Sequence, residues 1–230
     1  MPFTSSVRVP GYHAERLFDN LLRFRKAWSR YHRPDDVRHL LSLFPRVALE
    51  SGYELDYLPM GGTPTVWVWP FARRVGTRVE NLPELLAGID RDRLAGMRGS
   101  EAGRKIEAGT LYRLLTYEKT PTGLFEFAVF VNELWATKSA AKARDWLDLE
   151  PIFSRRVFDE ILRRSSGQAQ RVTRPESFDP TAQLSAQGGG EVSFLVHPSG
   201  GYKRIAELRL VVEPGGSVRR EMGKVIANLA

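Results

Sequence analysis

Cysteine is absent from this chain, lysine is scarce, and no apolar run is long. With no cysteine among 230 residues, disulfide frameworks and thiolate metal sites are excluded. The longest apolar runs, such as Phe127–Val131, are too short to span a bilayer. The first residues, MPFTSSVRVPGY, hold no apolar segment typical of a secretory signal. We therefore expect a cytoplasmic protein with no membrane contact.

Arginine, in contrast, is abundant. The chain holds 27 arginines and 7 lysines, and its 34 basic and 27 acidic residues give a formal net charge of +7. The planar guanidinium group matches the geometry of phosphate and stacks on flat rings. Such an excess favours a polyanionic partner, although a genome rich in arginine codons would give the same composition. We expect DNA or RNA as the partner, together with other protein subunits.

The N-terminal third predicts a helical hairpin followed by a β-hairpin. A first helix is indicated from about Tyr12 to Tyr31, and a second from Pro34 to about Glu50. Strands are predicted at Tyr53–Leu58 and Thr65–Trp69, because the PMGGTP segment between them has the composition of a tight reversal. The first helix has one apolar stripe, formed by Leu17, Leu21, Phe24, Trp28 and Tyr31.

The middle of the chain gives weaker signals. Strands are predicted at Leu111–Tyr117 and Leu124–Val131, the second because its composition is rich in Phe and Val. Helices are predicted at Asn81–Gly88, Lys138–Leu147 and Ser154–Ser165.

The C-terminal part predicts a hairpin and a final helix. Strands are expected at Glu191–Val196 and Lys203–Glu213. Ser217 is a suitable N-cap for a last helix. Its apolar stripe consists of Val218, Met222, Val225, Ile226 and Leu229.

These elements predict an α+β fold, with an N-terminal helical hairpin packed on antiparallel β-hairpins and a C-terminal hairpin plus helix. We expect a mixed α+β main domain at residues 1–167. A flexible loop or linker is expected at 168–190, because few of its residues are apolar. Residues 191–230 then complete the same fold.

A candidate phosphate-binding surface lies on the first helix. Arg16, Arg23, Lys26 and Arg30 fall on the side opposite its apolar stripe. An ordinary solvated helix face explains the same pattern. Further candidates elsewhere in the chain are Arg73, Arg74, Lys203 and Arg204.

Aromatic residues beside two of these arginines suggest a platform for bases. Trp67, Trp69 and Tyr57 precede Arg73 and Arg74, and aromatic rings next to cations are typical of single-strand binders. Packing of the same rings as core beneath the helical hairpin is the alternative, and we favour it.

The segment after Val196 holds the densest acid–base chemistry. Histidine is the residue type best suited to acid–base chemistry at neutral pH, so His197 is the candidate general base of a metal-independent ribonuclease, with Tyr202 and Lys203 beside it. A glycine-rich turn with polar side chains in water explains these residues equally simply.

Two groups of acidic and histidine residues have side chains that could bind a metal. His32, Asp36 and His39 have the spacing of one helix face, but a proline interrupts that helix. Glu54 and Asp56 share a strand face, but the facing strand supplies no further acid or lysine. We expect no metal and no cofactor.

The sequence therefore favours a non-catalytic nucleic-acid-binding subunit of a bacterial multi-protein assembly. One alternative is a metal-independent ribonuclease centred on His197. The other is a protein-interaction or scaffold subunit whose arginines contact acidic partners and no nucleic acid.

Overall fold

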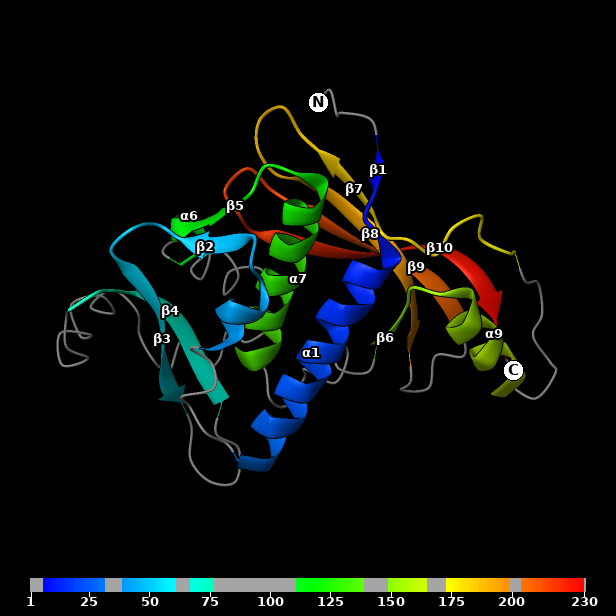
Figure 1. Ribbon diagram of the computed structural model, residues 1–230, viewed down its shortest axis with the longest axis horizontal. Helices are drawn as coiled ribbons and strands as arrows, with labels where there is room; N and C mark the ends of the chain where they lie inside the picture. Colours follow the sequence, from blue (N-terminus) through cyan, green and yellow to red (C-terminus); the bar gives the residue numbers. More distant parts are fainter. Residues whose placement is uncertain are drawn as a thin grey trace.

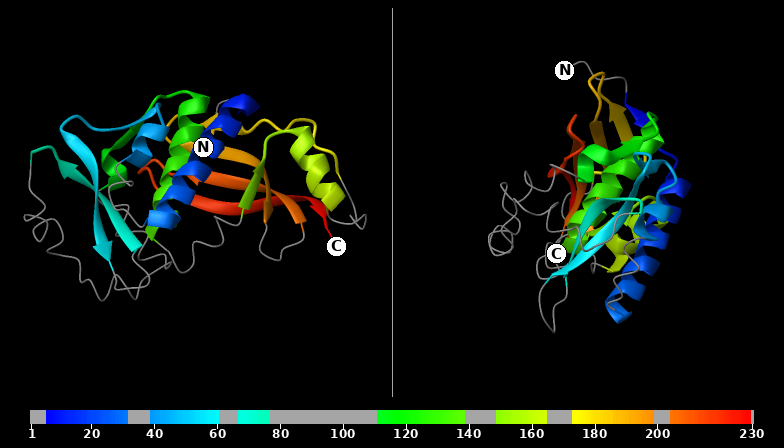
Figure 2. Two further views of the ribbon diagram at one scale, coloured as in Figure 1. Left: turned by 60° about the horizontal axis from the view of Figure 1, so that its bottom comes forward. Right: turned by 90° about the vertical axis from the view of Figure 1, so that its left-hand side faces the viewer.

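The protein has the mixed α+β fold that its sequence predicts (Figure 1). The computed structural model describes residues 6–31, 39–60, 67–76, 111–138, 149–164, 173–198 and 204–229; the side chains of residues 26–31, 58–60, 67–69, 135–138 and 198 lie outside that description. Two long helices, α1 (Gly11–Tyr31) and α7 (Pro121–Lys138), lie over one face of an antiparallel sheet, as both views of Figure 2 show.

The main sheet is antiparallel throughout. Its strand order is β1-β7-β8-β9-β10, and β6 also pairs with β8. β8 is long enough for one edge to pair with β7 in its first half and with β6 in its second. The strands are β1 (Val7–Arg8), β6 (Leu149–Ile152), β7 (Thr181–Leu184), β8 (Gly190–Pro198), β9 (Arg204–Val212) and β10 (Val218–Asn228).

Two small antiparallel sheets lie beside α7. The hairpin of β3 (Tyr53–Met60) and β4 (Trp67–Arg74) forms one end of the molecule, opposite the short helix α9 (Arg155–Arg164) (Figure 1). The other small sheet pairs β2 (Val47–Leu49) with β5 (Leu115–Tyr117). The connecting elements are η1 (Leu41–Leu43) and α6 (Leu111–Leu114).

The core forms around α7, which is buried on every side from Leu124 to Leu134. Its rings pack against α1 and the sheet; Phe125 lies 6.2 Å from Phe194 of β8 between ring centroids. Leu195 points to the opposite side of β8 and packs with α9 in a second cluster. One core therefore joins α1, α7 and the sheet, and a smaller one anchors α9.

Several predicted elements are confirmed. They are the first helix, the β3–β4 hairpin, the helix now labelled α9, and the β8–β9 hairpin. The helices predicted at Asn81–Gly88 and beyond Lys138 lie outside the described residues.

The predicted strand at Leu124–Val131 is wrong, because these residues form the middle of α7. Thr120 begins the helix, where its Oγ1 accepts a hydrogen bond from Gly123 N at 3.1 Å, and Pro121 takes the first helical position. A helix buried all round shows no amphipathic period, so its apolar run resembles a buried strand.

The predicted C-terminal helix is also wrong, because Val218–Asn228 forms β10 and pairs with β9. The preceding turn is closed by Glu213 N, which donates to Ser217 O, and uses Gly216 at a φ of 81°. Two register shifts, between Met222 and Val225 and between Val225 and Ala227, disrupt strand alternation. Met222 and Val225 of the predicted apolar stripe are exposed in the strand, at 41% and 40%, so the stripe does not form one buried side.

Three further predictions differ from the structure in the type or bounds of an element. The second helix cannot extend to Glu50, because Val47–Leu49 is β2. Residues 111–114 of the predicted strand are helical and only Leu115–Tyr117 is extended. Within the segment expected to be a loop, Thr181–Leu184 forms β7.

The N-terminus of α1 depends on a residue far along the chain. α1 has no acidic residue in its first turn, and Gly11 N donates to Asp179 Oδ1 at 2.9 Å. A Cβ on Gly11 would lie 2.7 Å from that oxygen and 3.2 Å from Phe153 O. Glycine is therefore required by the close approach of two other segments.

We expect Gly11→Ala to lower the free energy of unfolding by about 1–3 kcal/mol, because the added methyl group displaces Asp179. This result would oppose the intrinsic preference of alanine for helices. Gly215→Ala is the control, since a Cβ there meets nothing within 4 Å. Chemical denaturation measures both, and equal stabilities of the two variants would contradict this account.

Candidate nucleic-acid interface

Each buried carboxylate in the described part of the chain is bound by an arginine. Asp56, Glu126 and Glu133 are exposed by only 1%, 0% and 2%. A buried charge without a partner is costly, so such groups require a cation or several hydrogen bonds. Their arginine partners are Arg73, Arg46 and Arg25, respectively.

Glu126 joins three segments of the chain. Its Oε1 lies 2.9 Å from His13 Nε2 of α1 and 2.8 Å from Arg46 Nη1. Its Oε2 accepts a hydrogen bond from the backbone N–H of Arg46 at 2.8 Å. Arg46 Nε also lies 3.2 Å from Glu118 at the surface. The buried carboxylate thus connects α1, the residue before β2, and α7.

Glu133 makes the second polar contact between α7 and α1. Arg25 Nε donates to Glu133 Oε2 at 3.1 Å, and an Arg25 Nη2–H donates to Oε1. Glu126 and Glu133 are seven residues apart, so they lie on one side of α7. Together the two contacts set the rotation of α1 about its axis.

Arg73 binds two carboxylates across the β3–β4 hairpin. Its Nε donates to Asp56 Oδ2 at 2.6 Å, and its Nη2 contacts Glu54. Asp56 Oδ1 also accepts a hydrogen bond from Tyr57 N at 2.9 Å. The two acids considered for a metal therefore face an arginine.

Further arginines pair with acids on the main sheet. Arg209 of β9 donates from Nε to Glu191 Oε1 at 2.9 Å and lies 3.7 Å from Glu221. The hydrogen bond to Glu191 and the charge of that carboxylate raise the pKa of Arg209. Arg219 contacts Glu221 in turn. Arg209 and Arg219 are therefore bound by acidic residues of the same sheet.

Seven other arginines are exposed and have no ion-pair partner among the described residues. They are Arg8, Arg16, Arg23, Arg113, Arg156, Arg163 and Arg174. Arg113 lies on α6, and the other six come from β1, α1, α9 and the segment before β7.

Those six arginines belong to elements that meet at the start of α1. Gly11 approaches both Phe153 O, two residues before α9, and Asp179, five residues after Arg174. The rings of Phe18 and Phe153 lie 5.2 Å apart between centroids. We group Arg8, Arg16, Arg23, Arg156, Arg163 and Arg174 under the name α1–α9 face; α9 itself packs on the side of β8 to which Leu195 points.

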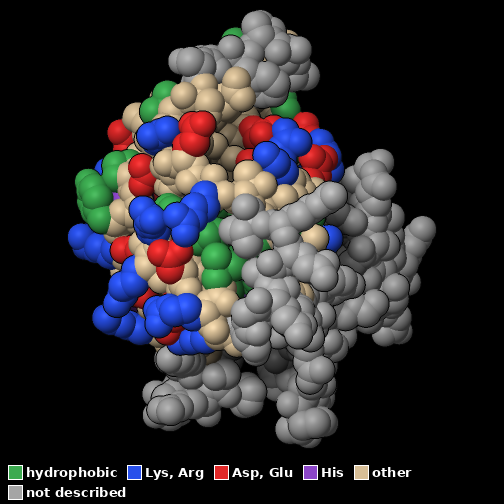
Figure 3. Space-filling view, turned by 90° about the vertical axis from the view of Figure 1, so that its right-hand side faces the viewer, with side chains coloured by type: hydrophobic (Ala, Val, Ile, Leu, Met, Phe, Trp, Pro, Cys, Tyr) green, Lys and Arg blue, Asp and Glu red, His purple; other side chains and the backbone are tan. Residues whose placement is uncertain are grey.

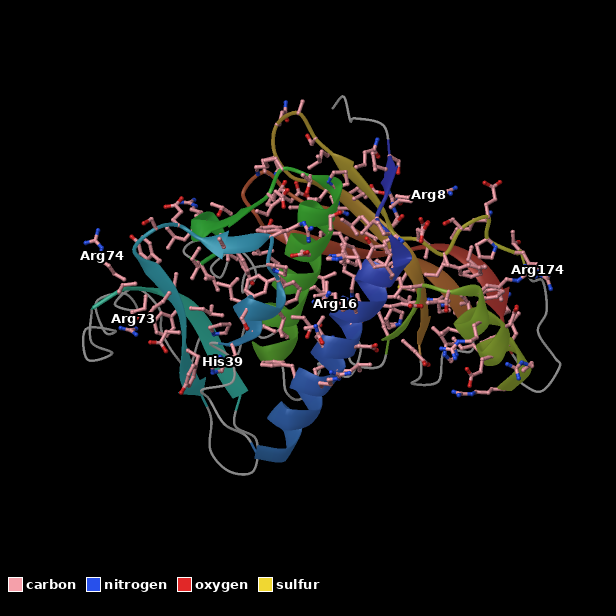
Figure 4. The ribbon with its side chains drawn as sticks, in the orientation of Figure 1. Arg8, Arg16, His39, Arg73, Arg74 and Arg174 are labelled. Carbon is pink, nitrogen blue, oxygen red and sulfur yellow. The ribbon has the colours of Figure 1, made fainter. Side chains whose placement is uncertain are left out.

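The figures show how the arginines are distributed. Arg8 and Arg174 lie toward the α9 end, Arg16 lies beside α1 in the middle of the view, and Arg73 and Arg74 lie at the opposite end of the molecule (Figure 4). Figure 3 views the α9 end and shows many Lys and Arg side chains there, with acidic side chains between them.

The spacing on the two helices suits repeated contacts. Arg16 and Arg23 on α1, like Arg156 and Arg163 on α9, are seven residues apart and share one side of their helix. Each pair is separated by about 10 Å along its axis. Each helix therefore presents two cations along one line.

The predicted phosphate ligands separate into distinct groups. The structure brings Arg16 and Arg23 to the α1–α9 face, and Lys26 and Arg30 follow on α1 with side chains outside the description. Arg74 and Arg204 each have another interaction, and Lys203 lies outside the described residues. Arg8 and Arg174 lie in no sequence motif or helical pattern, so the sequence alone does not identify them as candidates. The helical period of α9, in contrast, could have identified Arg156 and Arg163.

The predicted aromatic platform is not assembled by the described side chains. Tyr57 packs partly buried against the main core, and Arg73 beside it is bound by carboxylates. The side chains of Trp67 and Trp69 lie outside the description.

The predicted acid–base residues are only partly described. His197 lies on β8 opposite Glu150 of β6, with 3.8 Å between Nδ1 and the carboxylate, while Tyr202 lies outside the described residues. His39 O accepts a hydrogen bond from Ser42, and the described ranges contain no group of three or more potential metal-ligating residues.

We expect Arg73→Met to lower the free energy of unfolding by about 3–5 kcal/mol, because it leaves the Asp56 carboxylate buried without its cation. Adding Asp56→Leu should restore most of the lost stability. A double-mutant cycle by chemical denaturation measures the coupling.

Glu54→Gln is the control for this cycle, because the Glu54 side chain is 41% exposed although it contacts the same arginine. Its effect should stay below about 1 kcal/mol. Full stability of the Arg73→Met protein would show that Asp56 does not depend on Arg73.

No family model, no curated protein and no solved structure matches the chain. In the described part of the chain, no helix is both long and apolar enough to cross a membrane.

Proposed function

We propose that the protein is a non-catalytic nucleic-acid-binding subunit of a larger assembly, and that it holds phosphates on the α1–α9 face. The observation that carries this proposal is a set of six exposed arginines that have no ionic partner among the described residues. Elsewhere, arginines such as Arg25, Arg73 and Arg209 are bound by carboxylates.

The division between these two groups has an energetic basis. An arginine without a carboxylate partner contacts a phosphate and gains electrostatic energy while counterions are released from the nucleic acid. An arginine that already binds a buried carboxylate would have to leave that charge uncompensated, which costs several kcal/mol. The first group is therefore the one suited to a polyanion.

Acidic residues moderate the charge of the α1–α9 face. Asp19 is exposed between Arg16 and Arg23 on α1, where it lowers the local positive potential. Because these charges are exposed, salt screens their interaction with phosphates.

We expect neutralisation of Arg16, Arg23, Arg156 and Arg163 to glutamine to flatten the salt dependence of binding. The slope of log K against log salt should fall in magnitude by about 3, because each lost phosphate contact removes about 0.7–0.9. Labelled single- and double-stranded RNA and DNA, titrated across a salt series with chelator present, provide the measurement.

Single-site comparison gives the matched control. Arg16→Glu and Arg113→Glu change the net charge equally, and both arginines are exposed without an ionic partner among the described residues. Only Arg16→Glu should weaken binding strongly, because Arg113 lies on α6, away from the α1–α9 face. Equal losses would indicate a general charge effect and contradict a defined interface.

Two further outcomes identify the alternatives. Cleavage in chelator that His197→Ala abolishes would establish the ribonuclease. If no nucleic acid binds even at low salt, the nucleic-acid function is contradicted. A subunit that contacts only proteins is then favoured.

A further inference from the structure

Tyr12 is an exposed aromatic residue on the α1–α9 face. It lies in the first turn of α1, and 76% of its surface is accessible. No other large apolar side chain in the described chain is as exposed; Val75 follows at 61% and Leu22 at 46%. The described phenylalanines, in contrast, are mostly buried in the core. A ring left in water beside cations calls for a separate explanation.

The position of Tyr12 relative to the arginines follows from the helix. Arg16 and Arg23 are four and eleven residues after Tyr12, and both numbers return to nearly the same side of an α-helix. Arg8 precedes α1 by three residues. The ring therefore lies at one end of the side of α1 that carries Arg16 and Arg23, with the exposed Asp19 between them.

The buried ion pairs fix this orientation. His13, the next residue, is turned inward to Glu126 at 2.9 Å and meets Phe125 edge-on at 6.5 Å between ring centroids. Arg25 is likewise turned inward to Glu133. With these side chains held against α7, Tyr12 and Arg16 point into solvent.

An exposed ring adds a second kind of contact to a row of arginines. Arginines alone bind phosphates of single strands and duplexes alike. An aromatic ring stacks on the flat face of a base, and that face is accessible in a single strand but covered by its neighbours in a duplex. Stacking also accepts any base, so no sequence preference is required.

We propose that Tyr12 stacks on a base and that the α1–α9 face therefore binds single-stranded nucleic acid in preference to duplex. This inference rests on the proposed function, because it assigns the kind of nucleic acid to the same surface. Arg16 and Arg23 then hold phosphates that flank the stacked nucleotide.

The test compares Tyr12→Ala and Tyr12→Phe with single-stranded and duplex oligonucleotides of the same sequence. Tyr12→Ala should weaken single-strand binding by about 10-fold, because one stacked base is lost. The salt slope should stay unchanged, since no phosphate contact is removed. Tyr12→Phe keeps the ring and should bind within about 2-fold of the unmodified protein.

The Tyr12→Ala substitution does not destabilise the fold, so a change in binding reports the loss of the ring. Alanine favours helices more than tyrosine, so α1 is not weakened by the change. Leu22→Ala is the matched control, because Leu22 is a 46% exposed apolar residue on the same helix; it should leave binding unchanged. A single strand carrying 5-iodouracil should also cross-link to Tyr12 on irradiation.

The outcomes distinguish this inference from the proposed function. Normal single-strand binding by Tyr12→Ala, with a salt slope that still falls on neutralising Arg16 and Arg23, would overturn the stacking while the phosphate-binding surface stands. Equal weakening of single-strand and duplex binding would overturn the single-strand preference. Absence of any salt-dependent binding would overturn both proposals.

Discussion

The structure depends on the need to neutralise carboxylates that α7 carries into the core. Glu126 and Glu133 lie on a helix whose other side chains are largely apolar, and both are buried. Buried carboxylates are tolerated only where cations or hydrogen bonds reach them. Arg46, with His13, meets this need at Glu126, and Arg25 meets it at Glu133. Because two of these groups come from α1, the ion pairs determine how α1 lies on α7.

The need to neutralise buried carboxylates separates the arginines into two groups with different roles. Arg25, Arg46 and Arg73 stabilise the fold by compensating buried acids. The arginines of the α1–α9 face are left exposed by the same arrangement, because α1 can turn only one side toward α7. The overall charge of the chain cannot distinguish the groups, since it counts every guanidinium equally.

The sequence correctly predicts the helices whose apolar stripe faces a core and the hairpins whose turns are marked by typical turn residues. α1 and α9 each present an apolar stripe to a core, and the β3–β4 and β8–β9 hairpins are marked by turn residues. The sequence does not reveal α7, because burial on all sides removes the helical period. It does not reveal β10 either, because the apolar residues of that strand recur at helix-like spacing although Met222 and Val225 are exposed. In both cases tertiary packing, rather than local preference, determines the backbone.

The candidate site could be predicted only where one helix carries it. Arg16 and Arg23 follow from the helical period of α1, but Arg8 and Arg174 join them through contacts between distant segments, such as Gly11 with Asp179. The sequence predicts Arg73 as a phosphate ligand from its charge and its place beside aromatic residues. Its pairing with Asp56 and Glu54 requires the register of the β3–β4 hairpin, which the sequence does not specify.

The most direct test compares two arginines that lie two residues apart on α1. Arg25 binds the buried Glu133, whereas Arg23 is exposed without an ionic partner among the described residues. Arg25→Met should lower the free energy of unfolding by about 3–5 kcal/mol and leave the salt slope of the folded protein unchanged. Arg23→Met should change stability by less than about 0.5 kcal/mol and reduce the salt slope by about 1. If the two variants behave alike in both measurements, the arginines are not divided between fold and ligand, and the account is contradicted.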